Sequence, residues 1–241
     1  MSIAARHGSA VHCDSPPSRD NRFERLLAPE AWRQLPAPVR RRFSQHLGAT
    51  ATAVYTGEVA STRLNVAGRI FGQLARLIGA PLPLHSGDRV AACVVVTAEA
   101  AGGGQRWTRL YARPGRPSQV IQSSKNFAGP TGLEECVGGG IGMRLVLKVD
   151  DRALVFRSAG FFLRLGSRAF PIPAWLTPGI IEVRHREERD GRFSFMLTIT
   201  HPRFGRLVEQ IAYFVDLSPA QPHRPPAERA SVWSRSAGIG K

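Results

Sequence analysis

The clearest structural signal in the chain lies at residues 180–200, which read IIEVRHREERDGRFSFMLTIT. After the dipeptide Asp190-Gly191, apolar side chains occupy every second position from Phe193 to Ile199. Period-two alternation is typical of a strand with one buried face, and Asp-Gly favours a two-residue hairpin turn. The stretch therefore predicts two antiparallel strands joined by a tight turn at Asp190-Gly191.

The same period of two recurs through most of the chain from residue 50 onward. We expect about nine short strands in all, joined by tight turns, with no alternation of strand and helix. Besides the hairpin, the predicted strands cover residues 50–60, 88–99, 105–112, 118–127, 132–137, 142–149, 153–163 and 207–215. This pattern predicts a mainly β fold, an antiparallel sheet curled into a barrel or half-barrel.

Three helical patterns precede or interrupt these strands. A short stretch begins at Phe23, Leu26 and Leu27; a second has Pro38 in its first turn and Val39, Phe43 and Leu47 at every fourth position before Gly48; a third covers about 66–79. We expect two or three N-terminal helices packed at one end of the barrel. The arginines 40–42 are then predicted on the solvated face of the second helix.

Length and composition limit the class of protein. The 241 residues fit one large domain or two small ones, and three widely spaced cysteines indicate neither a disulfide framework nor a metal site. No apolar run is long enough for a membrane span or a signal peptide, so the expected compartment is the cytoplasm. Residues 1–20 and 218–241 read as disordered tails, which leaves a single β-rich domain over 21–217.

The chain is strongly basic, with 33 Lys and Arg against 18 Asp and Glu and a net charge of +15. The excess is spread evenly, at +4 for residues 1–50, +5 for 51–150 and +6 for 151–241, and no RNA-recognition, helix-turn-helix or finger motif accompanies it. Solvated surface charge is therefore favoured over a nucleic-acid role. We expect only non-specific, salt-sensitive association with nucleic acids.

The main candidate site is the strand that carries Trp107, Arg109 and Tyr111. These residues are two apart and so share one face of the sheet. Two readings stay open: Arg109 holds a carboxylate or phosphate in a pocket, or it pairs with a buried acid inside the barrel. Glu135 of the pair Glu134-Glu135 is the expected partner, since adjacent acids on a strand point to opposite faces.

Weaker candidates lie in the second half of the chain. His201 could shuttle a proton at the barrel mouth, although capping a turn is the favoured reading, and His185 is predicted to be solvated. The extended, proline-rich link from Phe170 to Pro178 carries Trp175 and could cover or plug a cavity. The glycines at 138–142 are read as a turn, because no helix follows them. No motif indicates a metal or a cofactor.

Several segments together resemble a known bacterial family, that of domain of unknown function 4166. They occur in order as LPAPVR at 35–40, WTRLY at 107–111, DRAL at 151–154, PIPAWLTP at 171–178, DGRFSF at 190–195 and HPRFG at 201–205. The resemblance covers about residues 21–217 and implies a single bacterial domain. Family members tend to carry a glutamate just before the Asp-Gly turn, for which Glu187 and Glu188 are the candidates here. The family brings no known reaction.

Three functional hypotheses follow. The chain could be a binding module that holds a small apolar or amphipathic acid in a cup, with Trp107, Arg109, Tyr111, Glu135, Trp175 and His201 as ligand-binding residues. It could be an enzyme acting on such a ligand through Glu135, His201 or Arg109. It could also be a structural or interaction protein whose barrel is filled by its own side chains. A cavity of about 300 to 1,000 Å³ would distinguish the first from the third.

Overall fold

The computed structural model describes residues 19–48, 51–77, 89–99, 103–113 and 115–218. Most of the two predicted tails lies outside these residues. Asp20 and Ser218, which the sequence assigned to the tails, both contact the domain. The backbone N–H of Asp20 donates to the carbonyl of Ser44, and the hydroxyl of Ser218 accepts from the N–H of Val54.

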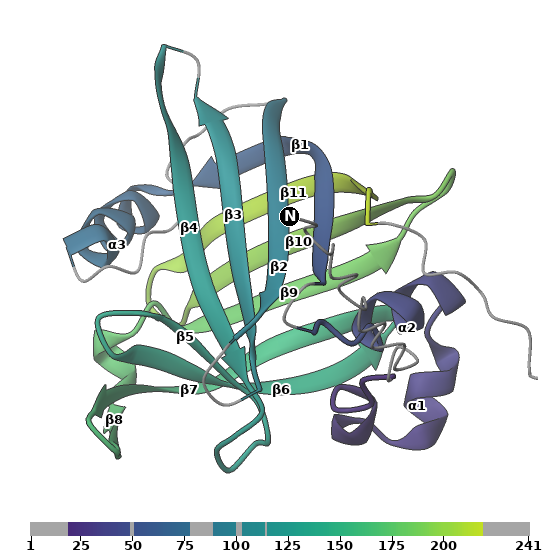
Figure 1. Cartoon of the computed structure of the whole chain (residues 1–241). Coiled ribbons are helices and arrows are strands. Elements are labelled where there is room, and N and C mark those ends of the chain that lie inside the picture. The colour runs from purple at the N-terminus through teal and green to yellow at the C-terminus, as the bar shows by residue number, and fades with distance from the viewer. Residues whose placement is uncertain (1–18, 49–50, 78–88, 100–102, 114, 219–241) are drawn as a thin grey trace, which may run out of the picture.

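Eleven antiparallel strands form one sheet, and ten of them close into a barrel (Figure 1). The strands are β1 (Thr52–Leu64), β2 (Val90–Ala98), β3 (Gln105–Arg113), β4 (Arg116–Asn126), β5 (Glu134–Gly138), β6 (Ile141–Asp150), β7 (Ala153–Leu165), β8 (Arg168–Ile172), β9 (Ile180–Glu187), β10 (Arg192–His201) and β11 (Gly205–Asp216). Neighbours in the ring follow the order β6-β5-β4-β3-β2-β1-β11-β10-β9-β7, and β6 pairs with β7 to close it. The predicted mainly β barrel is confirmed.

The strand that sequence reasoning missed is β8. The link beginning at Phe170 was read as an extended loop, but its first residues pair with the second half of β7, where Pro171 lies opposite Phe162. Proline donates no hydrogen bond and is tolerated on an edge strand, and β8 pairs only with β7. The first half of β7 pairs with β9 instead. As a result β8 extends from the barrel wall as a short flap.

The predicted hairpin turn between β9 and β10 is confirmed. Asp190 and Gly191 have φ angles of 62° and 71°, and both positive values are what a two-residue turn of this hand requires. The β6–β7 hairpin uses the same geometry at Asp151 and Arg152, with φ of 48° and 59°. The glycines at 138–142 also form a turn, between β5 and β6, as expected.

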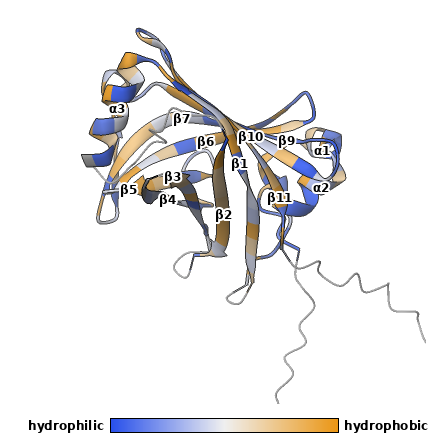
Figure 2. Ribbon diagram, turned by 90° about the horizontal axis from the view of Figure 1, so that it is seen from above, coloured by the Kyte–Doolittle hydropathy of each residue, from blue (hydrophilic) through white to orange (hydrophobic). Residues whose placement is uncertain are grey.

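The helices occupy opposite ends of the barrel. The short helices η1 (Glu24–Leu26), α1 (Pro29–Gln34) and α2 (Ala37–Phe43) lie together at one end, and α3 (Val66–Leu77) lies at the other (Figures 1 and 2). The predicted second helix was too long: α2 ends at Phe43, and Leu47 packs against the core from the following segment. No helix in the described ranges is long and apolar enough to cross a membrane.

Hydrophobic and hydrophilic residues alternate along the strands, as Figure 2 shows by colour. The inward side chains form one main core, which α2 caps through Phe43; its ring lies 5.6 Å from that of Phe156. A smaller apolar cluster of Ile199, Leu207 and Val208 packs with Phe71 of α3. The two ends of the barrel are thus covered by different helices.

Candidate functional site

A cavity of about 470 Å³ occupies the half of the barrel nearest α3. Its volume lies within the range of small-molecule sites. Most of its wall is apolar and comes from the strands, and Phe71, Leu74 and Ala75 of α3 contribute to its boundary. The residues Ile172, Leu176, Thr177 and Pro178 border it from the segment that follows β7.

Strand β3 carries the three residues singled out from the sequence, and all three line the cavity. Trp107 and Tyr111 are buried, while the side chain of Arg109 keeps 24% of its surface exposed. Their period-two spacing in β3 places them on the inner face. Arg109 is therefore a charged group on an otherwise largely apolar wall.

Arg109 belongs to a polar cluster centred on Glu135. The Nζ of Lys125 lies 2.9 Å from Glu135 Oε2, and the Ser123 hydroxyl donates to Glu135 Oε1 at 2.6 Å. Arg109 Nη1 donates to the Ser123 hydroxyl at 3.0 Å, and Arg109 Nη2 lies 3.5 Å from Glu135 Oε1. Arg109 thus pairs with Glu135, as the second reading expected, and it also lines the cavity.

Strand register explains why these side chains meet. Lys125 of β4 and Glu135 of β5 are direct Cα partners, and Ser123 of β4 lies opposite Trp107 of β3. Directly opposed residues on one face of an antiparallel pair have Cβ atoms about 5 Å apart. Three neighbouring strands thus direct their polar side chains to one inner spot.

The electrostatics of the cluster fix Glu135 as an anion. Burial alone would raise the pKa of Glu135, but the positive charges of Lys125 and Arg109, with hydrogen bonds from Lys125 and Ser123, lower it to about 2. Burial lowers the pKa of Lys125, and the charge of Arg109 acts in the same direction, while Glu135 opposes both. Two cationic side chains thus face one acid.

Lys125 is the residue that sequence reasoning missed. It is buried, and its Nζ lies 4.8 Å from the ring centroid of Trp107 and 5.7 Å from that of Phe156. The sequence did offer a signal that Lys125 points inward. Ile121, Ser123 and Lys125 are two residues apart and so share one face of β4, and the apolar Ile121 marks that face as inward. The prediction that Glu134 and Glu135 point apart also matches the geometry, since Glu134 pairs with Arg164 away from the cavity.

Two of the six candidate site residues do not line the cavity. Trp175 lies in η2 (Ala174–Leu176) and is 75% exposed, because this short helical turn directs Leu176 to the cavity instead. His201 is buried at the β10–β11 turn, where its Nδ1 accepts a hydrogen bond from the backbone N–H of Arg203 and its ring stacks on Phe204. The turn-capping reading of His201 therefore fits the structure.

His185 and the arginines of α2 were predicted to be solvated. The prediction was wrong for His185 and for Arg42. Arg42 and His185 are both buried at the barrel end covered by α2. Arg42 pairs with Glu187 at 2.6 Å and lies 3.9 Å from a carboxylate oxygen of Asp216, and its guanidinium stacks over Phe193. The helix places Arg42 over the barrel opening, where these acids on the strand ends compensate its charge. Glu187, one of the two acids suggested by the resemblance, thus has a partner here.

His185 is held neutral at this end. Burial, reinforced by the charge of Arg42, lowers its pKa well below the usual value. Arg42 Nη1 lies 2.9 Å from His185 Nε2, so the guanidinium donates and the ring nitrogen accepts. The remaining void among these residues is only about 10 Å³. This end of the barrel is filled by side chains.

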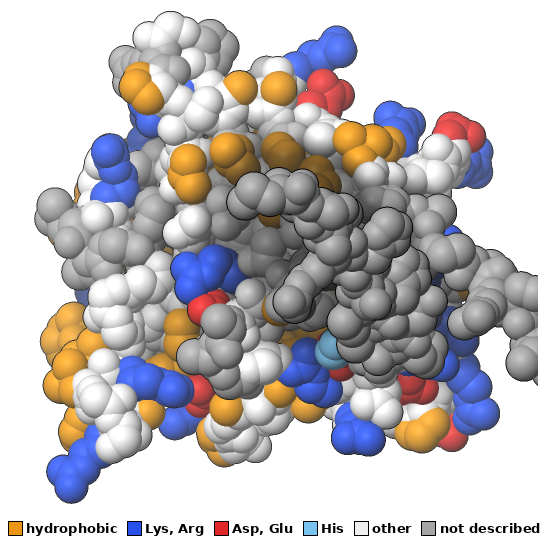
Figure 3. Space-filling model, in the orientation of Figure 1, with side chains coloured by type: hydrophobic (Ala, Val, Ile, Leu, Met, Phe, Trp, Pro, Cys, Tyr) orange, Lys and Arg blue, Asp and Glu red, His pale blue; other side chains and the backbone are white. Residues whose placement is uncertain are grey.

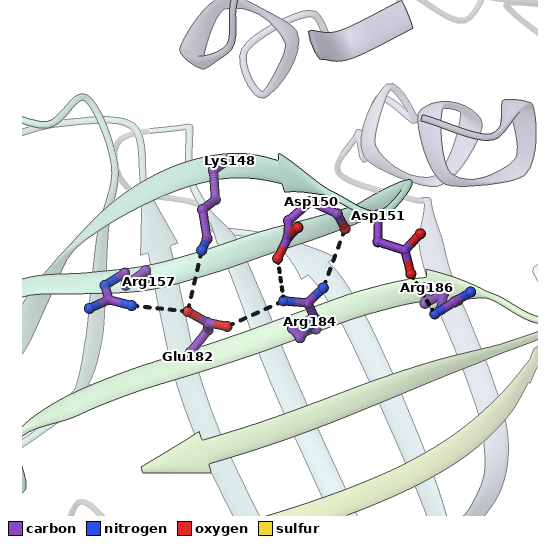
Figure 4. Close-up of polar contacts among 7 residues, drawn as sticks. All are labelled: Lys148, Asp150, Asp151, Arg157, Glu182, Arg184 and Arg186. Carbon is purple, nitrogen blue, oxygen red and sulfur yellow. Dashed lines mark hydrogen bonds and ion pairs between the residues drawn. The ribbon is translucent and has the colours of Figure 1, made fainter. Parts of the chain in front are cut away.

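Many surface arginines are paired with acids. On the outer face of β6, β7 and β9, Glu182 accepts from Arg157 and lies near Lys148, and further pairs join Asp150 to Arg184 and Asp151 to Arg186 (Figure 4). On the face seen in Figure 3, Lys and Arg side chains are scattered, and acidic side chains lie beside several of them. Among the described residues of that face, the Lys and Arg side chains form no continuous basic track for a nucleic-acid backbone.

Comparison with known proteins gives one finding. A family model described as a domain of unknown function (DUF4166) matches residues 35–214. The match includes the whole of the cavity wall contributed by β1 to β10 and nearly all of β11. No curated protein and no solved structure matches the chain significantly.

Proposed function

The chain belongs to the family of domain of unknown function 4166, and we propose that it is a binding module that holds a small apolar or amphipathic acid in the barrel cavity. The observation that carries this proposal is the charge balance on the cavity wall. Arg109 and Lys125 face a single acid, Glu135, so the cluster keeps one positive charge in an apolar cavity. A carboxylate bound at Arg109 would balance it.

The geometry around Arg109 leaves room for such a ligand. Arg109 uses Nη1 toward Ser123 and makes only a long contact of 3.5 Å to Glu135, while Lys125 makes the closer pair. A guanidinium has five N–H donors in a planar fork that matches a carboxylate. The apolar lining suits a hydrocarbon or aromatic body. A volume of about 470 Å³ supports a ligand site over a barrel filled by its own side chains.

The test compares two ligands that differ only in the acid group, decanoic acid and decanol. We expect decanoate to raise the unfolding midpoint of the protein and decanol to do so much less, since only the acid engages Arg109. Arg109→Met should weaken decanoate binding at least tenfold, the range for a hydrogen bond to a charged group. Calorimetric titration with both ligands measures this.

Arg106→Met is the matched control for that variant. Arg106 lies on the same strand, but its side chain is on the outer face and pairs with Glu99 at 2.6 Å. Decanoate binding should be unchanged in this variant. Failure of the parent protein to bind any aliphatic or aromatic acid, or equal decanoate affinity in Arg109→Met, would contradict the proposal.

A second candidate, an enzyme or covalent binder of carbonyl compounds, rests on Lys125. A desolvated lysine next to another cation is an activated amine, and Lys125 is buried in the cavity wall with Arg109 close by. Its nitrogen would attack an aldehyde carbon, and after proton transfer the oxygen would leave as water, giving an imine. Glu135 Oε2, 2.9 Å from Nζ, would hold the lysine side chain in position for this attack.

Trapping with cyanoborohydride tests this second candidate. The reductant would convert an imine with decanal into a stable secondary amine, which peptide mass mapping locates. Lys148 is the internal control, because its side chain is 45% exposed on the outer wall. Preferential labelling of Lys125 at low aldehyde concentration supports the reading, and labelling of Lys148 alone excludes it.

A further inference from the structure

The mouth of the cavity is surrounded by exposed apolar side chains. Two segments carry both cavity-lining and exposed residues, α3 at residues 66–77 and the segment 168–178, and the β10–β11 turn at 201–205 packs against Phe71 of α3. We call these three segments the rim. Its exposed large apolar residues are Val66, Ile70, Leu74, Phe170, Trp175, Leu176 and Phe204.

The rim is continuous with the cavity. Leu74 and Leu176 both line the cavity and are more than half exposed, at 55% and 56%. Phe71 lies between α3 and the turn, with its ring 5.8 Å from that of His201 and 6.3 Å from that of Phe204. Isolated exposed apolar residues are ordinary, but a contiguous apolar patch at the entrance of an apolar cavity indicates a contact surface.

The charge of the rim is entirely positive. None of its three segments contains Asp or Glu, and they contribute Arg69, Arg76, Arg168 and Arg203, all exposed. Among the described residues none of these four arginines forms an ion pair, in contrast with the paired arginines of the outer wall. Figure 3 shows apolar and basic side chains together at the lower left, where Figure 1 places β8.

We propose that the rim docks on an anionic lipid surface, which supplies or receives the acid that the cavity holds. The apolar side chains would enter the boundary between headgroups and acyl chains, and the unpaired arginines would contact anionic headgroups. In this position the cavity mouth opens toward the lipid, so an amphipathic acid passes without crossing water. The inference rests on the proposed function for its ligand, although docking itself is measured separately.

Charge complementarity favours an anionic lipid surface over a second copy of the chain as the partner of the rim. Two rims face to face would bring four unpaired arginines against four others with no acid between them, which is unfavourable. An anionic bilayer offers both negative headgroups and an apolar layer at the depth that side chains such as Trp175 would reach. Tryptophan is also enriched at the interface between membrane and water.

The experiment is flotation of the full chain with vesicles of phosphatidylcholine, with and without phosphatidylglycerol. We expect the protein to float with the mixed vesicles and much less with phosphatidylcholine alone, and the bound fraction to fall as salt rises. Two rim variants test the surface, Ile70→Ser with Trp175→Ser, and Arg69→Glu with Arg168→Glu; none of these four residues lines the cavity. Each should lower the bound fraction at least fivefold, and all four side chains are exposed, so folding should persist.

Two matched variants carry the same changes outside the rim. Val120→Ser with Val146→Ser removes exposed apolar groups from the barrel wall, and Arg25→Glu with Arg189→Glu reverses charges at η1 and at the β9–β10 turn. Both should float like the parent. Decanoate binding without vesicles, measured in all variants, separates the two proposals: rim variants that keep decanoate affinity but lose flotation support docking.

Several outcomes would overturn docking while leaving the ligand proposal intact. These are no flotation of a parent protein that binds decanoate, equal flotation with both vesicle types, or rim variants that float like the parent. A dimer in solution that the rim substitutions dissociate would show that a second copy covers the rim. Loss of decanoate binding in the parent with flotation retained would instead contradict the proposed function alone.

Discussion

The two ends of the barrel each bury a cluster of charged side chains, and the clusters differ in their balance. At the end covered by α2, one cation, Arg42, meets two acids, Glu187 and Asp216, and the space between them is filled. In the half nearest α3, two cations, Arg109 and Lys125, meet one acid beside a cavity of about 470 Å³.

This difference supports the proposal that one cluster is structural and the other is a binding site. Burying a charge is costly unless it is paired, so a filled cluster whose cation is matched within the chain acts on stability alone. We propose that the other cluster, which has a cation in excess next to empty apolar space, is completed by an anion from outside. Both clusters contain an arginine over an aromatic ring, and that feature does not distinguish them.

The largest expected effect comes from removing Arg42. Arg42→Met should lower the free energy of unfolding by about 3 to 5 kcal/mol, because it leaves Glu187 without its charge partner and disturbs the contact to His185. Denaturant titration measures this. Decanoate affinity should stay within a factor of two. A large loss of affinity with little loss of stability would indicate that the end covered by α2, rather than the half nearest α3, binds the ligand.

A smaller loss of stability, joined to a gain in binding, is expected from Glu135→Gln. Removing the charge leaves Lys125 and Arg109 uncompensated, and we expect a cost of about 2 kcal/mol from the lost charge-assisted hydrogen bonds. Decanoate should bind more tightly, since it then meets two free cations. Calorimetric titration checks the affinity, and weaker binding in this variant would indicate that Glu135 itself contacts the ligand.

Two valines on β2 compare the filled and hollow regions directly. Val94 lines the cavity, and Val96, two residues away on the same face, lines the filled end. Val96→Phe should cost about 1 to 3 kcal/mol by overpacking. Val94→Phe should cost less than about 1 kcal/mol and should abolish decanoate binding by occupying the cavity. Thermal unfolding with and without decanoate distinguishes the two variants. Equal losses of stability in both would mean that the cavity is closed in solution.

The smallest effect is the pH dependence contributed by His185. Its pKa is lowered in the folded protein from the usual histidine value of 6.5, so below that pH the unfolded chain binds a proton that the folded chain does not. Stability should therefore fall as pH falls below about 6.5, with a slope no steeper than about 1.4 kcal/mol per pH unit from this group. His185→Gln should be less stable overall but show a flatter profile between pH 6.5 and 5.

The sequence predicted the barrel and several of its inward-facing residues, because period two assigns each strand residue to a face. Trp107, Arg109, Tyr111 and Glu135 were found in this way. Lys125 escaped notice since charged residues rarely occupy inner positions, and its pairing depends on the register between β4 and β5. Arg42 and His185 were placed in water because their burial arises only when α2 lies across the strand ends, which local patterns do not encode.

The closure of the barrel has a consequence for how the protein is made. Strand β1 pairs with β11, so that Leu64 lies opposite Val208 and Tyr55 opposite Asp216. Contacts between strands that are this far apart in the sequence form slowly, and local hairpins such as β9–β10 form first. During synthesis the sheet keeps two open edges, on β1 and β10, until β11 emerges. A ligand that requires the closed wall therefore acts on completed chains, where it lengthens their lifetime but gives no help during synthesis.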